Sequence, residues 1–306
     1  MEHSKKIKFI MSLILLMFTL VACDINDIED VTNLIEQFED IAKDTKVNEE
    51  IVNVDGEMQV HFLDVGQGDS ALIICPNGES ILIDGGEKKY GDYIVDYLNK
   101  LGIEDIDVVI ATHPHSDHIG GLITVFENFN IKSVYTPRVT HTTKTYEEFV
   151  LAVQNQDLKF KEVKAGQGLE IQGIETRFLG PVDTYGDDLN NWSAVIKINY
   201  KNTSFLFTGD AEIKSENDII SSDADIEATV LKIGHHGSDT SSGDDFLDMV
   251  NPKYAVISAG VDNKYGHPHR SILDKINNKG IKLYRTDLQG SIIAFSDGKD
   301  LTFTTD

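Results

Sequence analysis

One stretch decides the fold and the chemistry of this chain: His113-Pro114-His115-Ser116-Asp117-His118-Ile119-Gly120-Gly121. The apolar, β-branched run over 106–111 directly precedes it and predicts a buried strand. In an extended segment His113 and His115 point the same way, so two imidazoles can bind one cation. Asp117 and His118 follow where the chain must turn, and they can reach a second cation beside the first.

These closely spaced histidine and aspartate side chains predict a divalent metal site. Neutral imidazole and carboxylate are the ligands that zinc and manganese use in proteins. The alternative is a histidine-rich surface loop that binds nothing, and the choice of ligand types argues against it.

The composition allows one large domain or two small ones with a sizeable core. The chain has 306 residues, of which 41% are hydrophobic, and a formal net charge of −24 at pH 7. A negative charge of this size opposes general attraction to nucleic acid or anionic lipid, but it does not exclude a groove in which bound cations invert the local charge. Cys75 ends an apolar run and is expected to be a small buried hydrophobe, so no disulfide framework is indicated.

The N-terminus carries the signals of an exported protein. Residues 1–22 have a basic start and then an apolar run, which predicts a secretory signal peptide. The ending Leu20-Val21-Ala22-Cys23 is similar to the lipobox of bacterial lipoproteins, which implies that Cys23 is lipidated and becomes the mature N-terminus. The alternative is an uncleaved signal anchor. Either interpretation predicts a protein tethered to the membrane at the bacterial cell surface, outside the cytoplasm.

Residues 23–56 are acidic and show no strand pattern. Apolar side chains recur at intervals of three and four between 25 and 41, which is typical of an amphipathic helix. A partly ordered spacer that lifts the next domain from the membrane is an equally good interpretation.

Residues 57–306 alternate between strand and helix patterns. Strands are predicted over 58–65, 71–75, 80–84, 106–111, 133–136, 160–163, 176–179, 194–200, 204–208, 228–233, 255–258, 282–285, 291–295 and 301–304. Helices are predicted over 93–101, 119–129, 146–154, 246–250 and 272–277. These patterns alone indicate a mixed α/β domain.

The motif H-x-H-x-D-H, followed by two glycines, resembles that of the metallo-β-lactamase fold hydrolases. Five further pieces narrow the resemblance to the hydrolase domain of ComEC-type competence proteins: Phe62-Leu63-Asp64-Val65-Gly66-Gln67-Gly68-Asp69-Ser70, Ile83-Asp84-Gly85-Gly86, Thr208-Gly209-Asp210, Leu231-Lys232-Ile233-Gly234-His235-His236-Gly237-Ser238 and Gly266-His267-Pro268-His269. The resemblance extends from Met58 to the C-terminus. It implies that 57–306 is one catalytic domain, an αββα four-layer sandwich with the metal ligands at one edge of the paired sheets.

The resemblance also implies ligand roles. Asp210 is expected to bridge two metal ions, although an aspartate at this point could instead cap the next helix. Neighbouring residues usually diverge, so we expect His236 to bind the second metal and His235 to stand beside the scissile oxygen. A purely structural role for both histidines is the alternative. Asp117 is expected to take part in catalysis as well as metal binding.

Several further residues are expected around the ligands. His267 is a candidate general acid or hydrogen-bond donor to phosphate, with His269 beside it, although both could be plain loop residues. Asp84 and Asp69 are expected to orient ligand histidines. No histidine occurs between His141 and His235, where many enzymes of this fold place another ligand.

In place of that histidine the chain carries Asn191 and Ser193, as ComEC-type relatives do. The first site then has His113, His115 and Asp210 as protein ligands, with solvent completing the shell. Such a site favours exchangeable manganese or partly filled zinc.

Two divalent ions can lower the pKa of a bridging water to about 7 and thereby supply hydroxide. The sequence therefore predicts a membrane-anchored, dinuclear-metal phosphodiesterase that acts on DNA or another phosphodiester. A hydrolase of cell-wall phosphoesters, such as teichoic-acid substituents, and a non-catalytic metal-binding lipoprotein are the alternatives. β-Lactam hydrolysis is disfavoured because the fold alone decides no chemistry. The chain has no P-loop and no Gly-x-Ser-x-Gly motif, so no nucleotide cofactor is expected.

Overall fold

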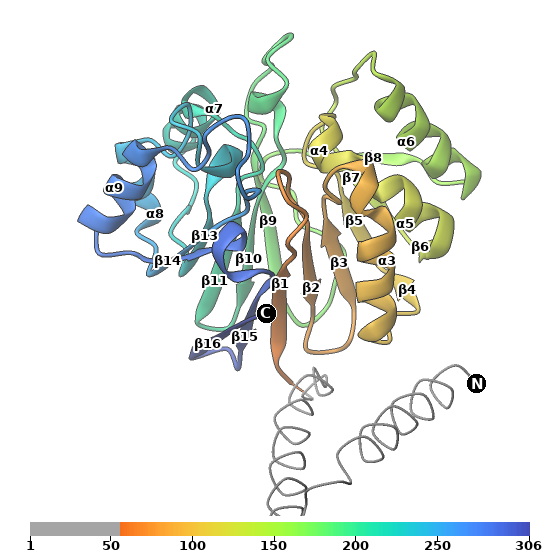
Figure 1. Ribbon diagram of the computed structural model, residues 1–306, viewed down its shortest axis with the longest axis horizontal. Coiled ribbons are helices and arrows are strands. Elements are labelled where there is room, and N and C mark those ends of the chain that lie inside the picture. Colours follow the sequence, from red (N-terminus) through yellow and green to blue (C-terminus); the bar gives the residue numbers. More distant parts are fainter. Residues whose placement is uncertain (1–55) are drawn as a thin grey trace, which may run out of the picture. The chain divides into compact units, whose positions relative to one another are not determined.

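The computed structural model describes residues 56–306 (Figure 1). The predicted signal peptide, Cys23 and the acidic segment lie outside the described residues. Within 56–306 no helix is both long enough and apolar enough to cross a membrane.

An eight-stranded sheet forms one half of the domain, in the order β16-β15-β1-β2-β3-β5-β7-β8. Pairing is antiparallel from β16 to β3 and parallel from β3 to β8. Its strands are β1 (Met58–Phe62), β2 (Ala71–Ile74), β3 (Ser80–Ile83), β5 (Val108–Ile110), β7 (Val134–Thr136), β8 (Phe160–Glu162), β15 (Ile292–Ser296) and β16 (Leu301–Thr305).

A six-stranded sheet forms the other half, in the order β14-β13-β12-β11-β10-β9. Pairing is antiparallel from β9 to β11 and parallel from β11 to β14. Its strands are β9 (Glu175–Gly180), β10 (Val195–Tyr200), β11 (Thr203–Phe207), β12 (Val230–Lys232), β13 (Tyr254–Ile257) and β14 (Lys282–Arg285). The short strands β4 (Asp105–Ile106) and β6 (Asn130–Ile131) pair separately.

Helices cover the outer face of each sheet (Figure 1). The eight-stranded sheet carries α3 (Gly91–Lys100), α4 (Ser116–Ile119), α5 (Leu122–Asn128) and α6 (Lys144–Asn155). The six-stranded sheet carries α7 (Ile213–Ser221), α8 (Asp244–Val250) and α9 (Arg270–Asn278), and the short α10 (Thr286–Gln289) follows β14.

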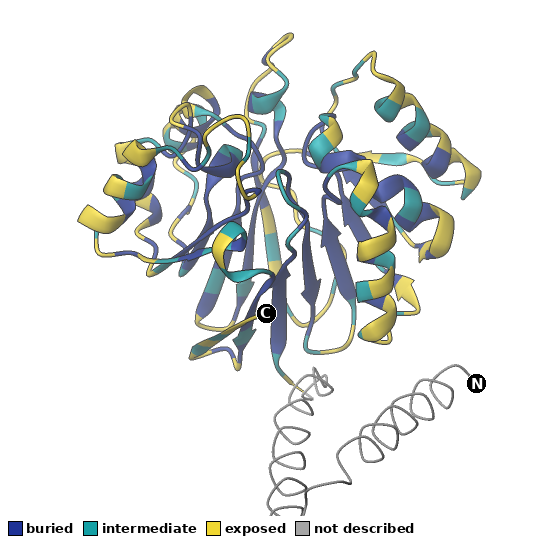
Figure 2. Cartoon of the chain, in the orientation of Figure 1, coloured by how far each residue is buried: buried dark blue, intermediate teal, exposed yellow. Residues whose placement is uncertain are grey.

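The two sheets and the helices on the outer face of each make four layers. Three separate apolar cores lie between them. Phe62 from β1 and Phe207 from β11 stack between the sheets, with ring centroids 5.7 Å apart. Leu72 and Leu82 point the other way from their strands and pack under α3 and α5. Leu206 and Leu231 lie in a third layer with α7 to α9. Figure 2 shows the result, with buried strands inside and exposed helix faces outside. The predicted αββα sandwich is confirmed.

The elements differ from the prediction in two informative places. The predicted helix over 119–129 is interrupted, so that α4 ends at Ile119 and α5 begins at Leu122. A side chain at Gly121 would meet the carbonyl oxygen of Gly85 at 2.1 Å, so the glycines allow two backbones to touch. Helix α7 was not predicted, because its buried face includes Ser215 and Glu216 and lacks an apolar period. The buried position predicted for Cys75 is confirmed.

Candidate metal centre

The chain leaves β5 in extended form and turns into α4 at Ser116. This geometry brings the Nε2 atom of His113 to 2.9 Å from the Nδ1 atom of His115. His118 lies one turn further, inside α4, and is fully buried. The ring centroids of His113 and His118 are 4.1 Å apart. The hexapeptide therefore gathers three imidazoles at the end of one strand.

Asp210 brings the second sheet to the same point. It follows β11 through Gly209, whose φ of +52° is costly for other residues. A side chain at Gly209 would also meet the Cβ atoms of Thr112 and Ser193 at 3.0 and 3.1 Å. The close turn places the Oδ2 atom of Asp210 3.2 Å from Nε2 of His118.

Asp210 also faces three more histidines. Its Oδ2 atom lies 3.8 Å from Nε2 of His113, 3.7 Å from Nε2 of His235 and 3.6 Å from Nε2 of His236. One carboxylate from the six-stranded sheet thus stands among imidazoles from both sheets. This is the arrangement that a bridging ligand requires.

The pair His235–His236 follows β12 in a strained backbone. Both residues have left-handed φ values, +47° and +54°, which are uncommon for residues with a side chain. The two ring centroids are 6.1 Å apart, and His236 is buried with its Nε2 atom 3.6 Å from Oδ2 of Asp117. His235 stays at the rim, where its Nδ1 atom lies 3.1 Å from Oε1 of Glu212.

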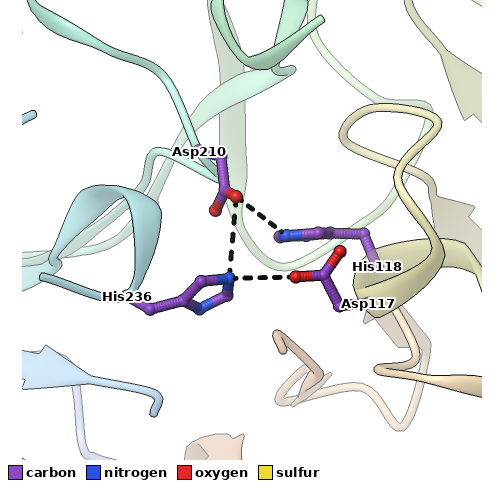
Figure 3. A group of neighbouring side chains, drawn as sticks. All are labelled: Asp117, His118, Asp210 and His236. Carbon is purple, nitrogen blue, oxygen red and sulfur yellow. Dashed lines mark ion pairs between the residues drawn. The ribbon is translucent and has the colours of Figure 1, made fainter. Parts of the chain in front are cut away.

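The residues at the centre fit divalent metal ions. Asp117, His118, Asp210 and His236 each offer a ligand atom, and all four atoms lie within 4.8 Å of one another (Figure 3). Within the described part of the chain, Nε2 of His118, Nε2 of His236 and Oδ1 of Asp210 are buried without a hydrogen-bond partner. Burying unpaired polar atoms is unfavourable, and cations would give these atoms their partners.

Asp84 supports His118 from behind. Its Oδ2 atom lies 2.8 Å from Nδ1 of His118 and accepts a hydrogen bond of 2.6 Å from the Thr112 hydroxyl. Its Oδ1 atom accepts the backbone N–H of Thr112 at 2.8 Å. These contacts fix the His118 ring so that Nε2 faces Asp210.

Asp69 faces His236 as an ion-pair partner, whereas the hydrogen bond of Nδ1 goes to the Ser258 carbonyl oxygen at 3.1 Å, and Asp69 itself has a partner that was not predicted. Its Oδ1 atom lies 3.2 Å from Nδ1 of His236 and 2.9 Å from Nζ of Lys232. Lys232 is 4% exposed and also donates to the carbonyl oxygen of Ile233. A lysine inside the apolar run 228–233 was the available signal, because a buried lysine needs a charged partner.

The segment that replaces the missing histidine anchors the Asp210 loop. The Ser193 hydroxyl accepts the backbone N–H of Asp210 at 3.0 Å and lies 3.4 Å from Nδ1 of His113. The Asn191 side chain accepts the backbone N–H groups of Glu212 and Ser215. Ser193 therefore touches the centre directly, whereas Asn191 holds the chain just beyond it.

His267 and His269 lie at different distances from the centre. The ring centroid of His267 is 5.6 Å from that of His235 and 6.4 Å from that of His236. His269 turns away, and its Nδ1 atom accepts the backbone N–H of Asp239 at 3.0 Å. The structure thus brings His267 to the rim of the centre and places His269 outside it.

The pKa values of the histidines and aspartates in the centre are strongly shifted. Burial lowers the pKa of His118 and of His236, but nearby carboxylates, with Asp210 first, outweigh burial and raise both, that of His236 to about 10. Burial would raise the pKa of Asp210, yet the surrounding imidazoles hold it well below its usual range. Burial lowers the pKa of His113, and that of His267 to about 4. Metal ions bound at the imidazole nitrogens would replace protons here.

These features define the class of protein. The chain belongs to the Metallo-beta-lactamase superfamily, whose family model matches residues 63–261. Members of this superfamily are generally metal-dependent hydrolases, and they typically bind two divalent metal ions. The family predicted from the motifs is confirmed.

Competence proteins are among its relatives. ComE operon protein 3 of Bacillus subtilis (strain 168) is 32% identical over 253 residues, which cover 77% of this chain and 33% of that protein. Recombination protein 2 of Haemophilus influenzae is 31% identical over 239 residues, covering 76% of this chain and 28% of that protein. The aligned part is thus about a third of the length of these curated relatives.

A shorter match and a solved structure complete the comparison. Ribonuclease Z of Archaeoglobus fulgidus is 26% identical over 117 residues, covering 36% of this chain and 37% of that protein. A metal-dependent hydrolase of the beta-lactamase superfamily has a TM-score of 0.50 and 16% sequence identity, and the match covers 81% of this chain and 100% of that one. The last likeness supports the fold.

Proposed function

We propose that this protein is a dinuclear-metal phosphodiesterase that acts on DNA and is held at the bacterial cell surface by a lipid on Cys23. The observation that carries the proposal is the position of Asp210 among His113, His118, His235 and His236. Similarity to the competence and recombination proteins favours DNA as the substrate, and similarity to ribonuclease Z favours phosphodiester chemistry.

The residues would divide the work between two cations, zinc or manganese. His113, His115 and Asp210 would hold the first ion, and Asp117, His118, Asp210 and His236 the second. When bound, the ions supply hydroxide at neutral pH and stabilise the negative charge that develops on the phosphoryl group. His235 and His267 stand at the open side of the centre, where a substrate would enter.

His267 acts as a hydrogen-bond donor to phosphate in this proposal. The Gln67 side-chain oxygen accepts the Gly260 N–H at 3.2 Å, which turns its amide nitrogen toward Nδ1 of His267 at 3.4 Å. Nε2 of His267 then carries the hydrogen. Burial lowers the pKa of His267 to about 4, so its ring is neutral at pH 7 and donates a hydrogen bond more readily than a proton.

The test of the proposal is a substrate panel with metal analysis. The purified protein, loaded with zinc or with manganese, is assayed on single-stranded DNA, bis(p-nitrophenyl) phosphate and nitrocefin. Hydrolysis of the first two and not of nitrocefin is expected. Metal-loaded protein that hydrolyses neither phosphodiester would reject the proposal and favour a non-catalytic metal-binding protein.

The anchor is tested separately. Metabolic labelling with a radioactive fatty acid should label the parent protein and not Cys23→Ser. A parent protein that takes up no fatty acid but stays in the membrane fraction would reject lipidation of Cys23 and favour the uncleaved signal anchor.

A further inference from the structure

The loop that carries His267 is ordered by a single side chain. Asn263 donates to the carbonyl oxygens of Gly260 and His267 at 2.9 and 2.5 Å. Its Oδ1 atom accepts the backbone N–H groups of Tyr265 and His267 at 3.2 and 3.0 Å. One amide thus closes the loop with four hydrogen bonds, so the loop has a fixed shape.

This fixed loop presents an exposed aromatic ring beside the centre. Tyr265 is 53% exposed and is one of the exposed large hydrophobic side chains of the described residues. Gly266 has a φ of +73°, and the turn there lays the ring of Tyr265 against that of His267. Their centroids are 5.6 Å apart and their planes differ by 23°. A path of neighbouring rings therefore leads from His236 through His267 to Tyr265.

A positive charge lies at the same ring. The Nζ atom of Lys264 is 4.9 Å from the centroid of the Tyr265 ring. Proteins that bind single-stranded nucleic acid combine aromatic rings, on which bases stack, with positive charge for the backbone, and Tyr265 with Lys264 over its ring offers one group of each kind. The chain as a whole has a net charge of −24, so Lys264 supplies a local positive charge near His267 that the rest of the chain does not favour.

We infer that Tyr265 is the platform on which a nucleobase of the substrate stacks while the phosphate next to it lies at the metal centre. The inference rests on the proposed function and narrows it to phosphodiesters that carry a nucleoside with a free base. It favours single strands, because a paired base offers neither of its faces to a side chain.

The test uses two substrates that share a leaving group. The p-nitrophenyl ester of thymidine 5′-monophosphate has a base, and methyl p-nitrophenyl phosphate has none. Tyr265→Leu should lower the preference for the nucleotide ester, as a ratio of kcat/KM values, by about 5- to 150-fold, which is the range that loss of one base stack gives. Tyr265→Phe, which keeps the ring, should retain the preference. Equal ratios in the parent and Tyr265→Leu would overturn the inference.

A binding measurement separates this inference from the proposed function. If the parent protein hydrolyses neither ester, the proposed function fails, and fluorescence anisotropy with oligothymidylate and with an abasic strand of equal length tests the platform. Tighter binding of oligothymidylate by the parent and by Tyr265→Phe, lost in Tyr265→Leu, supports the platform. Equal affinity of the parent for both strands, or a preference that survives in Tyr265→Leu, overturns it.

Discussion

Two of the buried histidines of the centre, His118 and His236, each lie against a buried aspartate, and the two aspartates are held by chemically different groups. Each turns Nε2 toward Asp210 and places Nδ1 against a buried carboxylate, Asp84 for His118 and Asp69 for His236. His118 comes from the eight-stranded sheet and His236 from the six-stranded one. The centre is thus built from two similar halves that meet at one aspartate.

The halves differ in what holds the supporting carboxylate. Asp84 accepts two hydrogen bonds from Thr112, a neutral partner, and is fully buried. Asp69 is paired with the ammonium group of Lys232. Burial raises the pKa of Asp84, whereas Lys232 and His236 outweigh burial at Asp69 and lower its pKa to about 2. The first half relies on hydrogen bonds, and the second on a buried ion pair.

Loss of the Asp210 carboxylate should remove a metal ligand that both halves share, so we expect it to lower activity the most. Asp210→Asn is expected to lower kcat/KM by well over the roughly 100-fold that loss of a residue that only orients a ligand causes. Metal content should fall for both ions, which elemental analysis measures. Asp92→Asn, an exposed aspartate on α3, is the control and should match the parent. Full metal occupancy in Asp210→Asn would show that this carboxylate does not join the two halves.

Lys232→Met should distinguish the two halves by its effect on the free energy of unfolding, because only the half around His236 contains the buried ion pair. The change leaves Asp69 buried without its ammonium partner, and such a loss costs about 3–5 kcal/mol in the free energy of unfolding. Asp69→Asn in the same chain should restore part of that stability, because it removes a buried carboxylate that has only His236 left as a charged partner. Urea unfolding of the metal-free proteins gives the comparison.

A second lysine in a strand provides the control for this cycle. Lys197 is 5% exposed, but its partner Asp225 lies in solvent, so Lys197→Met leaves a carboxylate that water can solvate. It should be less destabilising than Lys232→Met. Equal effects of the two changes would mean that burial of the lysine stem, and not the pair with Asp69, carries the stability.

Asp84→Asn should weaken metal binding by the half around His118, with a smaller effect on the stability of the whole protein than Lys232→Met has. The amide cannot accept the Nδ1 proton as strongly as the carboxylate, so metal affinity should fall about 10- to 100-fold. Competition with a chromogenic chelator measures this affinity. Asp69→Asn should have a weaker effect, because Nδ1 of His236 keeps the Ser258 carbonyl oxygen at 3.1 Å. The reverse order would contradict the assignment of hydrogen-bond support to His118.

The same comparison explains what the sequence could predict. The half around His118 lies in one hexapeptide after an apolar strand. The spacing of its residues was therefore enough to predict the ligands His113, His115, Asp117 and His118. The half around His236 is distributed over distant strands, and only the resemblance to a family joined its members to the hexapeptide. Lys232 was missed because a strand pattern cannot show whether a polar residue on the buried face has a partner.

The fold was predictable to a similar degree. Strands with continuous apolar runs, such as 71–75 and 204–208, appear close to their predicted bounds. Helix α7 was missed because Glu216 on its buried face binds the start of α8 and replaces an apolar contact by hydrogen bonds. A side chain that caps another helix, distant in the sequence, leaves no periodic apolar pattern from which its own helix could be predicted.

Glu216 gives the smallest effect that we expect, a change in the pH dependence of stability. It is a buried carboxylate that accepts hydrogen bonds from the backbone and contacts no histidine of the centre. Burial raises its pKa to about 7, against the opposing hydrogen bonds from Gly243 and Ser242. The folded protein therefore binds a proton more tightly than the unfolded chain, so the stability from this group is complete below the unfolded pKa and disappears as pH rises through about 7. Between pH 5.5 and 6.5 the free energy of unfolding of the parent should fall by about 1 kcal/mol relative to Glu216→Gln. Urea unfolding at both pH values measures the difference, and metal affinity should stay unchanged in Glu216→Gln. A change in metal affinity would mean that the centre senses carboxylates beyond Asp84 and Asp69, which would remove the distinction between its two halves.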